Sequence, residues 1–170
     1  MRGTTQAAVV LAMAGALASI SSAAENRIDL AALITKADAQ TVLGEAVKDP
    51  QARSEESADG YYSKCNYYSE NPGRSLVLRV RLISTGQLEP KEQLEEMSAE
   101  KDKNRFKPVT GLGDKAALVK EGPDKGPGHA LILYVAKANA FVMIGISGID
   151  DEKSATEKAK TLARKILGKL

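Results

Sequence analysis

Two side chains in this sequence could support nucleophilic catalysis, and each type occurs only once. Cys65 is the single cysteine and His129 is the single histidine. A cysteine nucleophile needs a base within reach, and nothing in the sequence places His129 beside Cys65. The histidine follows a Gly-Pro-rich stretch that predicts an exposed loop. Free cysteines are among the most buried residues. We therefore predict that Cys65 packs in the core, with an intermolecular disulfide as the main alternative, and we expect no catalytic residue.

Neither a metal site nor a phosphate-binding loop is indicated. One Cys and one His fall short of the three or four ligands of a transition-metal site. The acidic run 150–152 lacks the alternating ligands of a calcium loop, and helix capping explains it better. Residues 111–115, Gly-Leu-Gly-Asp-Lys, lack the third glycine of a dinucleotide fingerprint and the Ser or Thr of a P-loop. We predict a turn there, and we expect no metal ion and no cofactor.

A tyrosine-rich segment at 61–68 is the most distinctive feature, with four of the five tyrosines. Alternate side chains of a strand face opposite sides, which directs Tyr61, Cys65 and Tyr67 to the core and their neighbours to solvent. Residues 75–83 alternate in the same way. Tyrosine offers contact area, and arginine offers a fork that pairs with anions. The predicted ligand- or partner-binding residues are Tyr62, Lys64, Tyr68, Arg79 and Arg81.

Composition narrows the class of protein further. The chain has 170 residues, 43% of them hydrophobic, and 24 Lys plus Arg against 22 Asp plus Glu give a formal charge of +2. A dedicated nucleic-acid-binding protein needs a larger excess of positive charge, and a disulfide scaffold needs more cysteines. We therefore expect an ordinary soluble domain with no nucleic-acid partner.

The first 24 residues are predicted to be a secretory signal peptide. Arg2 supplies the positive start, residues 7–20 form an uncharged apolar run, and Ser22-x-Ala24 has the spacing of small residues that signal peptidase accepts. The apolar run is shorter than the roughly 20 residues that span a bilayer, so a membrane anchor is the weaker interpretation. We expect export to the periplasm or the extracellular medium, and a mature chain of one domain over 25–170 without a transmembrane anchor.

The expected elements alternate between helices and strands. Thr35 and Asp38 form a capping box that begins a short helix, and Gly44 suits its end. Residues 45–60 are polar and predict a loop or a weak strand. Helices are expected over 35–43, 90–103 and 150–170, and strands over 61–68, 75–83, 116–120, 130–137 and 141–147. This order predicts an α+β fold in which helices pack on an antiparallel sheet.

Five short segments carry a resemblance to a known group of proteins. They are 35–44, Cys65-Asn66-Tyr67, 111–116, 135–146 and 159–170, in that order. Together they resemble small exported bacterial proteins of uncharacterised function, including actinobacterial lipoprotein domains, whose structural relatives have a PsbP-like α/β sandwich. The chain differs from the lipoproteins in having no acylated cysteine. The resemblance implies a PsbP-like fold and export, and it implies no catalytic residue.

The sequence thus favours a noncatalytic exported domain that binds an unknown protein or small molecule. One alternative is a structural protein of the cell envelope. The other is a hydrolase, for which Cys65 and His129 are the obvious pair.

Overall fold

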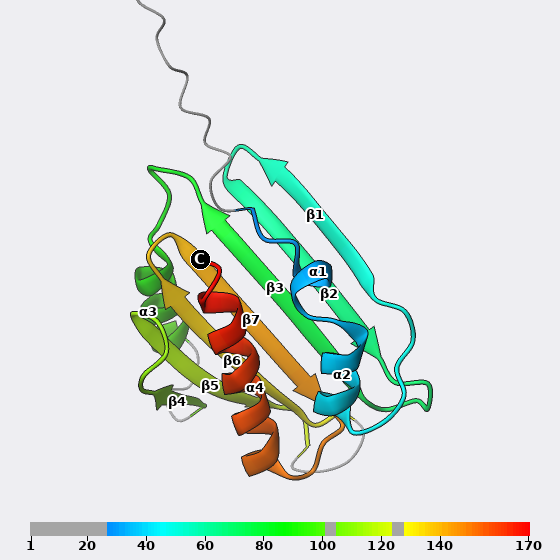
Figure 1. The fold of residues 1–170 in the computed structure, drawn as a ribbon. Helices are drawn as coiled ribbons and strands as arrows, with labels where there is room; N and C mark the ends of the chain where they lie inside the picture. The colour runs from blue at the N-terminus through cyan, green and yellow to red at the C-terminus, as the bar shows by residue number, and fades with distance from the viewer. Residues whose placement is uncertain (1–26, 101–104, 124–127) are drawn as a thin grey trace, which may run out of the picture.

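The computed structural model describes residues 27–100, 105–123 and 128–170 (Figure 1). Two short helices precede the first strand: α1 (Leu30–Leu33) and α2 (Lys36–Leu43). The Asp29 carboxylate accepts hydrogen bonds from two backbone N–H groups of α1. The capping box predicted at Thr35 and Asp38 is present at the start of α2. Both helices are short and need tertiary packing to be stable.

Seven strands form one antiparallel sheet in the order β1-β2-β3-β7-β6-β5-β4. Their bounds are β1 Gln51–Ser57, β2 Gly60–Tyr68, β3 Ser75–Ile83, β4 Phe106–Val109, β5 Lys115–Glu121, β6 Ala130–Lys137 and β7 Ala140–Ser147. The strands β1, β2 and β3 are neighbours both in the chain and in the sheet, and the same is true of β4, β5, β6 and β7. The pairing of β3 with β7 joins the two groups.

One face of the sheet is covered by α1, α2 and the C-terminal helix α4 (Glu152–Leu167), which lie in front of the strands in Figure 1. We call it the covered face. Side chains at alternate positions of β2, β3, β6 and β7 meet these helices, and Leu78, Leu133 and Ile144 are fully buried among them. The buried residues of α4 pack against this face: Ala155, Ala159, Leu162, Ala163, Ile166 and Leu167. The main core therefore lies between these three helices and the sheet.

The opposite face is covered only in part. The helix α3 (Pro90–Glu100) contacts β5 and β6. It closes a smaller apolar cluster that includes Leu94, Phe106 and Val119. The side chains that β1, β2 and β3 direct to this side have no helix over them among the described residues. We call this part of the sheet, opposite α1 and α2, the open face.

The structure confirms the α+β class, with helices packed on an antiparallel sheet. Residues 51–57 form a regular strand, where the sequence predicts a loop or a weak strand. The sequence signal is weak because β1 is exposed along its whole length and shows no hydrophobic alternation. The predicted signal peptide 1–24 and the expected helical residues 101–103 lie outside the described residues. Among the residues described, no helix is both long and apolar enough to cross a membrane.

Candidate binding face

The five predicted binding residues all lie on the open face. The register of β2 and β3 sets Tyr62 directly opposite Arg81 and Lys64 opposite Arg79. Tyr68 is opposite Ser75 at the other end of the pair and is 36% exposed. The sequence predicted these residues but not the register, and the observed register brings four of them into two adjacent pairs.

A row of three cations crosses this face. Lys64 is opposite Arg53 on β1 as well as Arg79 on β3. We call Arg53, Lys64 and Arg79 the cation row. Directly opposed side chains have Cβ atoms about 5 Å apart, and like charges in such positions destabilise a sheet. Folding therefore brings together three charges that repel one another.

Little negative charge compensates this row. Arg53 forms an ion pair with Glu55 at 2.5 Å. Within the described part of the chain, Lys64, Arg79 and Arg81 have no ion-pair or hydrogen-bond partner for their side chains. The remaining cationic groups are free to contact an anion from outside the domain.

A cavity of about 410 Å³ continues the face at the tip of the β1–β2 hairpin. Its lining combines two predicted residues with acidic and small ones: Glu55, Ser57, Asp59, Gly60, Tyr61, Tyr62 and Arg81. Gly60 has a φ of +128°, and a Cβ there would lie 1.9 Å from the carbonyl oxygen of Leu82. Glycine thus allows the first residue of β2 to approach β3 closely beside the cavity.

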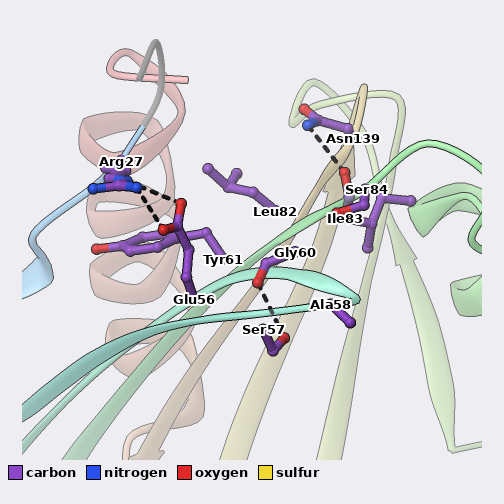
Figure 2. Close-up of a pocket in the computed structure, with 10 residues that line it drawn as sticks. All are labelled: Arg27, Glu56, Ser57, Ala58, Gly60, Tyr61, Leu82, Ile83, Ser84 and Asn139. Atoms are coloured by element: carbon purple, nitrogen blue, oxygen red, sulfur yellow. Dashed lines mark hydrogen bonds and ion pairs between the residues drawn. The ribbon is translucent and has the colours of Figure 1, made fainter. Parts of the chain in front are cut away.

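A second cavity, of about 700 Å³, lies at the same hairpin tip and shares three lining residues with the first. Figure 2 shows its lining, in which the Arg27 guanidinium makes two hydrogen bonds to the Glu56 carboxylate, at 3.1 and 2.5 Å. Both side chains are more than half exposed. Because each neutralises the other, this cavity offers weaker attraction for an anion than the cation row.

The tyrosines on the covered face have structural roles. The Tyr61 hydroxyl donates to the carbonyl of Ile28 at 3.0 Å. The hydroxyl of fully buried Tyr67 donates to the carbonyl of Ile34, the C-cap of α1. Burial raises the pKa of Tyr67 above the ordinary tyrosine value of about 10, so the donor also stays protonated in mildly alkaline solution. These bonds attach α1 to the sheet, and the predicted division of the tyrosines between core and solvent is confirmed.

Cys65 and His129 do not meet. Cys65 is on β2 and His129 directly precedes β6, with β3 and β7 between them, which is a lateral separation of roughly 14 Å at about 4.8 Å per strand. Cys65 is fully buried, and burial raises the pKa of its thiol. The predicted core position of Cys65 is confirmed.

The prediction of an exposed loop position for His129 is wrong. Its side chain is buried, and Nδ1 lies 2.8 Å from the carbonyl oxygen of Pro123. The Gly-Pro content of the segment predicted a loop, but not that the carbonyl of Pro123 would lie within hydrogen-bond distance of the ring. A hydrogen bond from the histidine to the loop backbone explains how a buried imidazole is satisfied.

The other motifs also have structural explanations. Asp151 caps α4, and its carboxylate accepts from the backbone N–H of Ser154 at 3.0 Å. At the glycine turn, a Cβ on Gly113 would lie 2.3 Å from the carbonyl oxygen of Ala136, and the Asp114 carboxylate accepts from the N–H of Ala138. No group of three or more metal-ligating side chains is found among the residues that the structure describes.

Sequence reasoning missed Arg53, Glu55 and Asp59 at this site. They belong to a segment whose polar composition predicted a loop or a weak strand, and only the pairing of β1 with β2 brings Arg53 beside Lys64. Because β1 has no hydrophobic period, no sequence pattern could have assigned these residues to a strand beside β2.

Comparison with family models, with curated proteins and with solved structures finds no match to this chain. Arguments about function therefore rest on the geometry of the open face.

Proposed function

We propose that this protein is a noncatalytic exported domain whose open face binds an acidic segment of a partner protein. The observation that carries the proposal is the cation row, three directly opposed basic residues on an uncovered sheet surface, with Arg81 beside it. A carboxylate between Lys64 and Arg79 would relieve their repulsion, because an opposite charge favours both ionised groups. Binding would thus remove an unfavourable interaction of the free protein.

The surrounding side chains suit a protein partner. Arginine presents a planar fork that matches a carboxylate. The ring of Tyr62 lies next to the row and that of Tyr68 lies further along β2, beyond Asn66, and both would supply contact area at low cost in side-chain entropy. The acidic residue Asp59 at the hairpin tip would repel a second anion and so orient the bound segment.

Export and a PsbP-like fold form part of the same proposal. The predicted cleavage after Ala24 supports export, and the resemblance described above supports the fold family. Mass spectrometry of the protein recovered from culture medium and periplasm tests export directly, since a chain beginning at residue 25 is expected. An intact chain that begins at residue 1 would contradict it.

A pull-down from the native envelope fraction tests the binding proposal. The wild type is compared with a Lys64→Glu/Arg79→Glu variant and with a control of the same net charge, Lys153→Glu/Lys169→Glu, whose changes lie on exposed positions of α4 and the C-terminus. We expect the open-face variant to lose its partner while the control retains it. Equal recovery by all three proteins would refute the open face as the site.

The same experiment addresses the alternatives. Running it with and without reducing agent tests the intermolecular disulfide through Cys65, which would require β2 to expose a buried sulfur. A structural envelope protein would sediment with the insoluble fraction in all variants. For the hydrolase, an activity that survives in a Cys65→Ser/His129→Ala variant would exclude the obvious pair.

A further inference from the structure

The two edges of the sheet differ. At one edge, β4 has four residues and contains Pro108, which cannot donate a backbone hydrogen bond. At the other edge, β1 has seven residues, all exposed, that pair with β2 in continuous register. Figure 1 shows β1 as the outermost strand, and among the described elements its contacts are mainly with β2. Half of the backbone N–H and C=O groups of such a strand point away from the sheet and can pair with another strand.

The charges of β1 complement those of a second copy of the same strand. Suppose that two copies pair antiparallel about a twofold axis at Ser54. Arg53 of each copy then lies opposite Glu55 of the other, on the open face. Ala52 lies opposite Glu56, and Gln51 opposite Ser57, so the whole strand is paired.

Neighbouring registers lack this complementarity. A twofold axis perpendicular to the sheet keeps each side chain on its own face, and directly opposed residues must share a face. The axis therefore passes through a residue, and neighbouring registers differ by moving the axis one residue along β1. An axis at Arg53 places two arginines opposite each other, and an axis at Glu55 places two glutamates opposite each other. Charge therefore selects the register centred on Ser54.

We propose that two copies of this protein associate through antiparallel β1–β1 pairing centred on Ser54, which forms one continuous sheet across the dimer. Pairing would satisfy the outward backbone groups of both edge strands with about six to eight hydrogen bonds. It also places a carboxylate from the second copy at the end of each cation row, beside Arg53. The two open faces then lie side by side on the same surface of the dimer.

A charge swap tests this register. In Arg53→Glu, four glutamates meet across the axis, and in Glu55→Arg, four arginines meet there. Each variant is expected to raise the dimer dissociation constant about tenfold or more. The double variant Arg53→Glu/Glu55→Arg restores opposite charges at both contacts and is expected to dimerise like the wild type. An equimolar mixture of the two single variants is expected to form heterodimers.

Sedimentation velocity over a range of protein concentrations measures the association, and circular dichroism checks that these exposed substitutions leave the fold intact. The proposal is overturned if the wild type remains monomeric at every concentration, or if the double variant fails to recover the association lost in the single ones. Lys48→Glu, an exposed change outside the strand, serves as the control for net charge.

Discussion

The two sides of β2 and β3 differ sharply although they alternate residue by residue. Cys65, Tyr67 and Leu78 face the helices and are fully buried. Lys64 and Arg79, their neighbours in the chain, face the other side, where no helix from the described part of the chain covers them. The difference shows that these strands contribute one alternate set of side chains to the main core, while the other set lies on the open face.

The open face also differs from the part of the same surface under α3. There, β6 and β7 present Tyr134 and Phe141, with ring centroids 5.9 Å apart, and Tyr134 is 6.3 Å from Phe106. Arg79 and Arg81 lie directly opposite Met143 and Phe141. The side chains on this surface thus change from apolar on β6 and β7 to basic on β3, and among the described residues the main contacts of α3 are with β5 and β6.

Truncating neighbouring side chains of β3 should give the largest contrast between the two sides. Leu78→Ala removes fully buried atoms and is expected to lower the free energy of unfolding by about 3 kcal/mol. Val77→Ala, on the open face, is expected to cost less than about 1 kcal/mol. Urea denaturation of both variants measures the difference. Equal losses would mean that the open face is covered in solution.

A smaller contrast is expected between two tyrosines of β2. Tyr67→Phe leaves the buried carbonyl of Ile34 without its donor and should cost about 1–2 kcal/mol, whereas Tyr62→Phe should cost almost nothing.

The Tyr67 contribution should also depend on pH. Since the folded-state pKa of Tyr67 is raised, its stabilisation is fully present below the unfolded pKa of about 10 and declines as pH rises above that value. Denaturation at neutral and alkaline pH tests both expectations. A Tyr67→Phe deficit that persists unchanged at high pH would contradict the proposed hydrogen bond.

Asp38 connects α2 to α4 over the covered face through Lys165, at 2.8 Å. Burial raises the pKa of Asp38, but hydrogen bonds from Lys165 and Thr35 outweigh it, and the pKa lies below its ordinary value. Asp38→Asn should therefore cost about 1 kcal/mol at pH 7. The deficit should vanish as pH falls through the lowered pKa, below about 4.

Denaturation between pH 7 and pH 2 checks the Asp38 expectation. Asp49→Asn, whose carboxylate is 92% exposed in its pair with Lys36, is the control and should change stability little at any pH. If Asp38→Asn lowers the free energy of unfolding at neutral pH no more than the control does, the ion pair between Asp38 and Lys165 does not stabilise the packing of α2 and α4.

The smallest expected effect has the opposite sign. Lys64→Gln removes the central charge of the cation row and should raise the free energy of unfolding by about 0.3 kcal/mol at low ionic strength. Salt should abolish the gain, because it screens exposed charges. Lys48→Gln is the matched control. A destabilising Lys64→Gln would show that the row is compensated within the domain.

Much of the fold could be predicted because local signals agreed with the tertiary structure. The capping box at Thr35 and the alternation of 75–83 each predict one element from a few residues of local sequence. The weaker elements were missed: α1 is a single turn capped by Asp29, and β4 has four residues. Such short pieces exist only through packing on the rest of the protein.

The candidate site could be predicted in its residue types but not in its arrangement. Alternation assigned Lys64 and Arg81 to the solvent side, yet their neighbours depend on strand register, which the sequence of one strand does not encode. The sequence could not predict Arg53 as a residue of the site, because β1 lacks a hydrophobic period and is held by its pairing with β2.

The β3–β7 ladder has a consequence for biogenesis. It joins residues that are 58 to 72 positions apart in the chain, while the side chain of Lys158 in the last helix donates to the carbonyl of Val42, 116 positions away. Loop closure over such distances slows folding. Nearly the whole chain must be synthesised before β3 can pair with β7. Such a nascent chain stays unfolded for longer than one whose sheet forms from contacts between neighbouring segments.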